Sequence, residues 1–301
     1  MIDISHKRTS LRYAKAGGKL FAGPEVIERV KNKSVPKGDV AEVARSAGIQ
    51  AAKRTSEWIV FCHSLPLDWV EVSMEYEPDG LRFTAEVRTV WKTGLEMEAI
   101  TAVQAALMNA YDMLKPLQVD MELGEIKLLE KRGGKSDYSD EFSSSLKTGL
   151  LIVSTDKKSG KRKDSAGQII REKLEGQPVD LVVDENLQED RTTLRQRIEE
   201  LTGDGGLELL FLCGGTGLGD NDFVPEILKE FKGREIPGME EAMRDHGIAQ
   251  TPFGMLSRQK AVLINSTLVI ALPGSSGGAR ESLDALFPGV LHVFHQRNPD
   301  R

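Results

Sequence analysis

Hydrophobic and polar residues alternate with a period of two in parts of the first half of the chain. Residues 70–76 and 81–87 each place an apolar side chain at every second position, with charged or hydroxyl side chains between. Pro78, Asp79 and Gly80 separate the two stretches, and these residue types favour turns. The pattern predicts an antiparallel hairpin with one face in water, and residues 125–130 are predicted as a further short strand.

Apolar residues recur with a helical period over 39–58 and 96–114 of the same half. Asp39 precedes the first of these segments, and an aspartate in that position is expected to cap the helix. Helices that cover one face of an antiparallel sheet bury the apolar surfaces of both. We therefore predict an α+β architecture for the first half.

The second half contains continuous apolar stretches instead of alternating ones. They occupy 149–155, 179–183, 207–213 and, in two pieces, 261–272. Segments of helical period lie between them at 166–174, 191–201 and 225–231. Buried strands that alternate with helices predict an α/β, doubly wound, mostly parallel sheet.

A segment rich in glycine, serine and charge separates the halves and shows no periodicity, as expected of a linker. We assign a first domain to 1–136, the linker to 137–146 and a second domain to 147–301.

Composition excludes several classes of protein. No apolar stretch approaches the roughly 20 residues of a membrane-spanning helix, and no signal peptide is expected at the N-terminus. The two cysteines, Cys62 and Cys213, are too few for a disulfide scaffold or a four-cysteine zinc site. A net charge of −6 and 6% aromatic residues argue against a nucleic-acid-binding body. We expect a cytoplasmic protein with reduced thiols.

Three stretches of the first half, within 37–55, 61–67 and 92–115, combine residue types suited to acid–base and anion chemistry. Asp112 and Lys115 are three residues apart and share a helix face. Glu98 and Asp112 also point the same way, but they lie ~21 Å apart along a continuous helix. If both serve one small-substrate site, the helix is broken or the site lies between two subunits.

Taken in order, six motifs of the first half resemble the cyclic pyranopterin monophosphate synthase family, which acts early in molybdenum-cofactor biosynthesis. The motifs lie at 37–40, 48–55, 62–65, 92–99, 111–115 and 133–136, within a match from about Ile2 to Ser136. The resemblance implies a ferredoxin-like α+β fold, a hexamer built from dimers and a site at a subunit interface. It also implies conversion of a cyclised dihydro-GTP triphosphate into cyclic pyranopterin monophosphate and pyrophosphate. We expect this half to require no cofactor.

The same resemblance assigns roles to individual residues. Asp112 becomes the catalytic acid/base with Lys115 and Lys131 beside it, and Lys37 joins this catalytic group. Lys37 and Arg12 are expected to contact the triphosphate. The residues expected to line the substrate pocket are Phe61, Cys62, His63, Met97 and Glu98. The sequence departs from the family pattern at Ser64 and Pro116, but neither change removes a chemical group.

A cluster of glycines at 214–219 follows the apolar stretch 207–213 and precedes a helix. Parallel sheets bind phosphates at such places, because backbone N–H groups approach the anion closely where no Cβ intervenes. A second loop of this kind lies at 273–278. Asp184, at a predicted strand end, and Asp222, in the glycine loop, are candidates to bind Mg²⁺ beside a phosphate. The alternative is that both aspartates are caps or turn formers.

The second half, from about Lys147 to Phe294, resembles the molybdopterin-binding family, which includes molybdopterin adenylyltransferase. The motifs lie at 164–167, 183–185, 214–217, 222–226, 236–238, 256–258 and 272–275. The resemblance implies a trimeric or hexameric domain that transfers AMP from Mg·ATP to molybdopterin. It makes Asp184 and Asp222 the functional carboxylates. It makes Gly214, Gly215, Thr216 and Gly217 the anion cradle, and Gly274 and Ser275 a second pocket wall.

Three interpretations stay open on the sequence. The first is a bifunctional enzyme of one pathway, with small pterin and nucleotide substrates, a homo-oligomeric assembly, and neither nucleic acid nor membrane as partner. The second makes the second half a non-catalytic molybdopterin-binding or oligomerising domain, because Cys213 and Val224 stand where that family commonly has threonine. The third is a nucleotide- or RNA-binding module without turnover.

Overall fold

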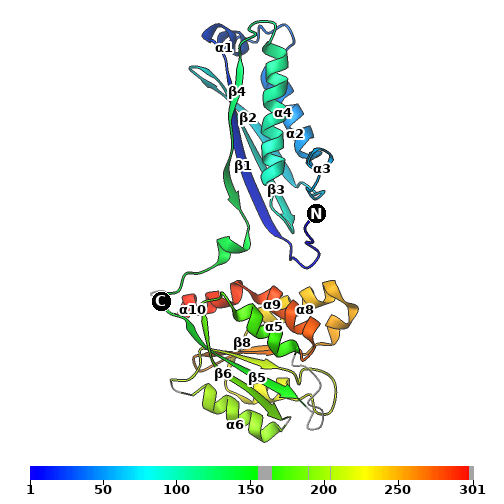
Figure 1. The fold of residues 1–301 in the computed structure, drawn as a ribbon, viewed down its shortest axis with the longest axis vertical. Coiled ribbons are helices and arrows are strands. Elements are labelled where there is room, and N and C mark those ends of the chain that lie inside the picture. The colour runs from blue at the N-terminus through cyan, green and yellow to red at the C-terminus, as the bar shows by residue number, and fades with distance from the viewer. Residues whose placement is uncertain (155–164, 189, 204, 298–301) are drawn as a thin grey trace. The chain divides into compact units, whose positions relative to one another are not determined.

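The computed structural model describes residues 1–154, 165–188, 190–203 and 205–297. The chain forms two compact units, Met1–Tyr138 and Ser139–Arg301 (Figure 1). Thr155 and Asp164, which belong to the predicted strand and motif above, lie outside the described residues. Within those residues, no helix has both the length and the apolar character needed to cross a membrane.

The N-terminal unit is a four-stranded antiparallel sheet with α2 and α4 packed on one face (Figure 1). The strand order is β2-β3-β1-β4. The strands are β1 (Ser10–Phe21), β2 (Trp69–Glu77), β3 (Gly80–Trp91) and β4 (Glu122–Arg132). The helices are α1 (Pro24–Lys31), α2 (Val40–Ala52), α3 (Thr55–Trp58) and α4 (Glu96–Leu114), with a 3-10 turn η1 (Lys135–Tyr138).

The hairpin and the long helix predicted from the sequence are confirmed. β2 and β3 pair from Trp69 opposite Arg88 to Glu77 opposite Gly80, and their alternating apolar side chains face the helices. The Asp39 carboxylate caps α2 by accepting hydrogen bonds from the backbone N–H groups of Ala41 (3.0 Å) and Glu42 (3.3 Å). The N-terminal unit therefore has the predicted α+β architecture.

The central strand β1 was not among the predicted elements. It pairs with β3 on one side and β4 on the other, but two glycines and scattered lysines break its alternation. Gly18 is needed because α4 lies close to the sheet. A Cβ added at Gly18 would lie 2.7 Å from side-chain atoms of both Leu107 and Val103.

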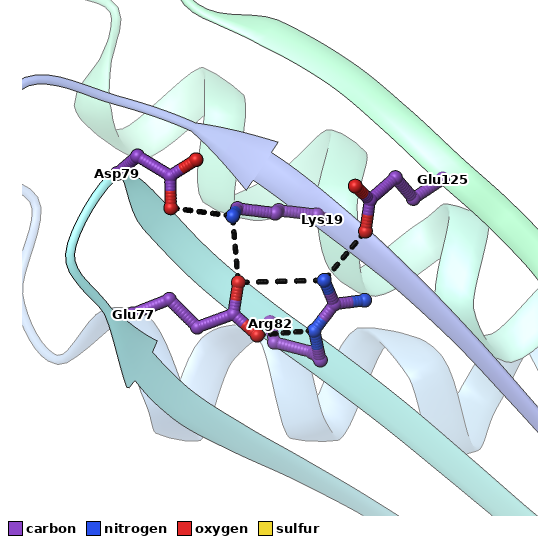
Figure 2. Close-up of polar contacts among 5 residues, drawn as sticks. All are labelled: Lys19, Glu77, Asp79, Arg82 and Glu125. Carbon is purple, nitrogen blue, oxygen red and sulfur yellow. Dashed lines mark hydrogen bonds and ion pairs between the residues drawn. The ribbon is translucent and has the colours of Figure 1, made fainter.

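Lys19 on β1 is nearly buried, and a charged network neutralises it at one end of the sheet (Figure 2). Its Nζ lies 2.5 Å from Asp79 Oδ1 and 2.6 Å from Glu77 Oε2. Arg82 pairs with the same Glu77 and lies 2.5 Å from Glu125 Oε2. Hydrogen bonds from Arg82 and then Lys19 lower the pKa of Glu77 to about 2. The network thus ties the β2–β3 turn to β1 and to the bulge of β4.

The C-terminal unit is a six-stranded sheet of order β6-β5-β7-β10-β9-β8. The strands are β5 (Leu146–Ser154), β6 (Val179–Gln188), β7 (Leu209–Cys213), β8 (Arg234–Glu235), β9 (Lys260–Ile264) and β10 (Thr267–Leu272). The helices are α5 (Ser165–Leu174), α6 (Arg191–Leu201), α7 (Val224–Glu230), α8 (Pro237–Gln250), α9 (Ser276–Leu286) and α10 (His292–Arg297). Two 3-10 turns, η2 (Pro252–Leu256) and η3 (Gly289–Leu291), complete the unit.

The sheet is mostly parallel, as predicted, and helices cover both of its faces. β6, β5, β7 and β10 run parallel to one another. The predicted segment 261–272 instead forms a tight antiparallel pair, β9 and β10, and β8 continues the antiparallel edge. Leu150 and Phe211 face a core shared with α5, α8 and α9, whereas Leu151 and Leu210 face a second core with α6 and α7.

Candidate functional site

Helix α4 carries candidate residues of the N-terminal unit at both of its ends. Glu98 lies in its first turn and Asp112 in its last. The helix is unbroken from Glu96 to Leu114, so these two positions lie ~21 Å apart along its axis. Of the two alternatives for a single site, the broken helix is therefore excluded within this chain.

Asp112 lies between two lysine ammonium groups. Lys37 Nζ is 2.6 Å from Asp112 Oδ2 and also donates to the Asp112 backbone carbonyl, and Lys115 Nζ is 2.7 Å from Oδ1. Their hydrogen bonds, that of Lys115 first, lower the pKa of Asp112 to about 2 although its side chain is 56% exposed. The cluster holds an ionised carboxylate at neutral pH beside cations suited to a phosphate.

Glu98 occupies the opposite electrostatic environment. It is only 3% exposed and lines a cavity of about 490 Å³. Burial, with a smaller contribution from the charge of Glu96, raises the pKa of Glu98 to about 7. The Cys62 Sγ lies 3.9 Å from Glu98 Oε1, and burial also raises the pKa of this thiol. A carboxyl group that titrates near neutral pH can both donate and accept a proton during a reaction.

The structure brings the predicted pocket residues together. Phe61, Cys62, His63, Met97 and Glu98 all line this cavity. No pattern in the sequence indicated that the first residues of the chain also belong to it. Met1, Ile2, Ile4 and Lys7 line the cavity as well, and His63 Nε2 lies 2.9 Å from the Ile2 carbonyl oxygen.

Lys131 does not lie beside Asp112 within one chain. Its Nζ is 3.4 Å from Glu96 Oε1, at the Glu98 end of α4. Arg12 lies on β1, beside the end of β3 that leads into α4. Its Nε donates to the Trp91 carbonyl over 3.3 Å. The catalytic group assigned by resemblance is thus divided, with Lys37, Asp112 and Lys115 at one end of the helix and Lys131 at the other.

In the C-terminal unit, the glycine loop after β7 adopts a conformation that requires glycine. Gly214 and Gly215 have φ angles of +108° and +65°. A Cβ on Gly214 would lie 2.3 Å from the Val153 carbonyl oxygen. The second glycine loop is adjacent, since a Cβ added at Gly274 would lie 3.2 Å from Gly214 Cα. Both loops follow neighbouring parallel strands, β7 and β10.

Arg258 fixes the glycine loop from one side, a role that its motif alone did not indicate. Its Nε donates to the Gly217 carbonyl (2.7 Å), and its backbone N–H donates to the Thr216 carbonyl (3.2 Å). Its remaining guanidinium nitrogens contact the Asp222 carbonyl and the Glu226 carboxylate. On the neighbouring loop, Ser275 caps α9 by accepting from the Gly278 N–H at 3.3 Å.

Asp184 is not at a strand end, contrary to the prediction. β6 continues to Gln188, and Asp184 pairs with Leu150 within the sheet. Its two carboxyl oxygens accept from Arg171 at 2.6 and 2.8 Å, and these hydrogen bonds lower its pKa. β5 also separates β6 from β7, which carries the glycine loop. This carboxylate therefore does not fit the role of a Mg²⁺ ligand.

Asp222 does lie within the glycine loop, where its Oδ2 accepts from the Gly219 N–H at 2.8 Å. A single carboxylate beside a phosphate cradle fits Mg²⁺, which is commonly held by one or two carboxylates and the substrate's phosphates. Among the described residues, no group of three or more His, Cys, Asp or Glu side chains could hold a metal ion.

The two units match two families of sequences. The MoaC family matches residues 1–134, and the family described as "probable molybdopterin binding domain" matches residues 149–292. Together with the two folds, these matches define the class: a two-domain protein of molybdenum cofactor biosynthesis.

Some relatives match nearly the whole chain. A molybdenum cofactor biosynthesis bifunctional protein of Chlorobaculum tepidum is 36% identical over 294 residues, which cover 98% of this chain and 93% of that protein. The chain belongs to this family of molybdenum cofactor biosynthesis bifunctional proteins.

Other relatives match one unit each. A cyclic pyranopterin monophosphate synthase of Aquifex aeolicus is 46% identical over 137 residues, which cover 46% of this chain and 54% of that protein. The solved structure of the molybdopterin biosynthesis enzyme MoaB from Thermus thermophilus is 35% identical, with a TM-score of 0.48. That match covers 52% of this chain and 98% of that one.

Proposed function

We propose that the N-terminal unit converts a cyclised dihydro-GTP triphosphate into cyclic pyranopterin monophosphate and pyrophosphate. The observation that carries this proposal is that helix α4 carries two carboxyl groups in opposed environments, one at each end. Glu98 has a pKa of about 7 and Asp112 a pKa of about 2. Ring opening and reclosure need groups that move protons, and the displacement of pyrophosphate needs focused cations. The likeness to the Aquifex aeolicus synthase supports the same reaction.

The surroundings of each residue determine whether it transfers protons or binds phosphate. Glu98 can hold or release a proton inside the cavity that accommodates the pterin. Lys37, Lys115, Lys131 and Arg12 supply positive charge for the triphosphate. When a triphosphate draws the lysine ammonium groups away from Asp112, the pKa of this carboxylate rises, and Asp112 becomes able to accept a proton and return it.

We also propose that the complete site forms between two copies of the chain in a homo-oligomer. An unbroken α4 keeps the Glu98 and Asp112 ends too far apart for one small substrate. A second copy can bring its Lys131 and Glu98 end to the Asp112 end of the first. The β-α-β-β-α-β element order and the strand order support assigning the N-terminal unit to the ferredoxin-like class.

The test uses the purified full chain and the cyclised dihydro-GTP triphosphate as substrate. We expect cyclic pyranopterin monophosphate and pyrophosphate in equal amounts, measured by chromatography and a pyrophosphate assay. The proposal fails if a folded, oligomeric chain releases neither product.

For the C-terminal unit, we propose that it binds molybdopterin with its phosphate at 214–217, beside Gly274 and Ser275. It transfers AMP from ATP to that phosphate, and pyrophosphate leaves. Mg²⁺ would be held by Asp222 together with ligand phosphates, where it would neutralise phosphate charge. Arg258 keeps the glycine loop in the conformation that presents its N–H groups.

The alternative, a molybdopterin-binding domain without turnover, is favoured by three observations. Cys213 and Val224 supply no hydroxyl next to the cradle, and Asp184 is occupied by Arg171. Incubation of the full chain with molybdopterin, ATP and Mg²⁺ distinguishes adenylyl transfer from binding without turnover. Adenylylated molybdopterin supports transfer, whereas binding without that product supports the alternative.

A further inference from the structure

Residues 1–7, which we call the strap, form one side of the cavity that contains Glu98. The strap precedes β1, and its described backbone makes turns but no helix or strand. Four of its side chains line the cavity, those of Met1, Ile2, Ile4 and Lys7. Cys62 and Glu98 line the same cavity from the body of the N-terminal unit. The strap therefore separates part of this cavity from solvent.

Two side chains of the body bind the backbone of the strap. Lys92, which directly follows β3, donates from its Nζ to the Ser5 carbonyl over 2.9 Å. His63, which follows α3, has its Nε2 2.9 Å from the Ile2 carbonyl oxygen. Because a carbonyl oxygen can only accept, this ring nitrogen carries a proton and donates it. The strap is therefore fastened at two points, from two separate segments of the chain.

The strap has local hydrogen bonds of its own but buries little apolar surface. The Ser5 N–H donates to Asp3 Oδ1 at 2.8 Å, and the Lys7 N–H donates to the Ile4 carbonyl at 3.1 Å. Met1 and Ile2 remain 74% and 78% exposed. A segment with few buried apolar contacts and solvent-exposed hydrogen bonds opens at a low cost in free energy. The contacts of Lys92 and His63 therefore carry much of the attachment.

We propose that the strap is a gate of the Glu98 cavity, and that Lys92 is a positioning residue that holds it closed. The open strap admits substrate, and the closed strap keeps water from Glu98 and Cys62. The role of the gate in turnover rests on the proposed synthase function, whereas the opening itself rests only on the contacts of the strap. The hydrogen bond from the Lys92 ammonium group is charge-assisted, so its loss shifts the strap toward the open form.

Cys62 provides a direct measure of opening, because it lines the cavity and Cys213, the other cysteine of the chain, is buried. The experiment measures the rate at which iodoacetamide alkylates Cys62 in the full chain, followed by peptide mass spectrometry. The variants are Lys92→Met and Ile4→Gly, which weaken a polar and an apolar contact of the strap.

The matched control is Lys127→Met, at an exposed position of β4 outside the cavity. We expect alkylation to be about tenfold faster in Lys92→Met, to be faster also in Ile4→Gly, and to be unchanged in the control. Loss of a positive charge disfavours the reactive thiolate and would by itself slow the reaction. A faster reaction in Lys92→Met therefore reports opening of the strap. Unchanged alkylation in both variants overturns the gate.

Turnover of the cyclised dihydro-GTP triphosphate by the same chains separates the gate from other roles of Lys92. We expect kcat to fall in both variants, because the strap closes less often over the bound substrate. A higher KM in Lys92→Met with kcat and alkylation unchanged assigns Lys92 to substrate binding and overturns the gate. Faster alkylation with an unchanged kcat removes the gate from the reaction. Failure of the unaltered chain to turn over the substrate overturns the proposed function, while alkylation still tests the opening.

Discussion

The carboxylate of Asp112 is held by lysines from two places, the loop after α1 and the end of α4. Asp112→Asn keeps the shape of the side chain but removes the charge and the proton-accepting oxygen. We expect turnover of the cyclised triphosphate to fall by at least ~10²-fold. Thermal stability and oligomer size should barely change, because exposed ion pairs contribute little.

Pyrophosphate release, thermal unfolding and size-exclusion chromatography check this prediction. Asp120→Asn, at an exposed position beyond the end of α4, is the matched control. Turnover near the unaltered level in Asp112→Asn would show that the catalytic assignment is wrong.

The buried Glu98 makes stability depend on pH. Its folded pKa of about 7 lies above its ordinary value of 4.5. Its contribution is therefore fully present below about pH 4.5 and is lost as the pH rises through about 7. Glu98→Gln should be more stable than the unaltered chain at pH 8, by up to ~3 kcal/mol, with the difference closing below pH 4.5.

Urea unfolding followed by tryptophan fluorescence measures this effect. Trp58, Trp69 and Trp91 are the three tryptophans of the chain and all belong to the N-terminal unit, so the signal reports on that unit alone. A stability difference that stays constant between pH 4 and pH 8 would contradict the assigned burial of the charge.

At the scale of elements, helices α2 and α4 approach each other closely at Gly48. A Cβ there would lie 2.9 Å from the Ala102 carbonyl oxygen and 3.0 Å from Val72 Cγ2. Gly48→Ala should therefore destabilise the N-terminal unit by ~1–3 kcal/mol, despite the better helix propensity of alanine.

Gly238→Ala in α8 provides the comparison, because a Cβ at that position meets nothing within 4 Å. This change should leave stability unchanged or raise it by up to ~1 kcal/mol. Calorimetric unfolding of both variants measures the contrast. Equal effects of the two changes would mean that the α2–α4 contact is looser than the structure shows.

Elements with a regular hydrophobic periodicity were predictable from the sequence. Elements whose residues are determined by tertiary contacts were not. The hairpin β2–β3 and helix α4 follow alternating and helical patterns closely. β1 was missed because α4 requires Gly18 and the charged network accommodates Lys19, so its pattern reflects tertiary contacts. The antiparallel direction of β9 depends on a tight turn at Asn265, a non-glycine residue with positive φ.

The lining of the N-terminal cavity was predictable in part from the sequence, but the geometry of the candidate sites was not. Cys62, His63 and Glu98 do meet in one cavity, as the resemblance implied. Placing Lys131 beside Glu96 and Asp184 beside Arg171 required the sheet registers, which sequence spacing does not contain. Met1 and Ile2 form part of the wall of this cavity, and no hydrophobic or polar pattern in the sequence indicated that role.

At the scale of the whole molecule, each unit has its own core and its own candidate site. Asp222→Asn should therefore abolish adenylyl transfer or weaken molybdopterin binding by the C-terminal unit. Synthase turnover by the N-terminal unit should stay unchanged. Parallel assays on one preparation measure both, and a matching loss of synthase turnover would contradict independent units.

The division of the N-terminal site predicts complementation between inactive chains. Co-expressed Asp112→Ala and Lys131→Ala chains should recover roughly a quarter of the activity, because half of the pairs are mixed and one of two sites in each is intact. Lys37→Ala mixed with Asp112→Ala should recover none, since Lys37 and Asp112 meet within one chain. Product formation by the purified mixtures measures both. No recovery in the first mixture would exclude a shared site.

Helix α4 also fixes the distance between Glu98 and Asp112. The residues between Glu98 and Asp112 set both the spacing and the angular phase of the two carboxyl groups. Inserting one residue among them would lengthen the axis by ~1.5 Å and rotate everything beyond it by ~100°. Asp112 would then turn away from Lys37. Substitutions along this segment preserve the spacing of the two carboxyl groups, whereas the insertion or deletion of a residue changes it.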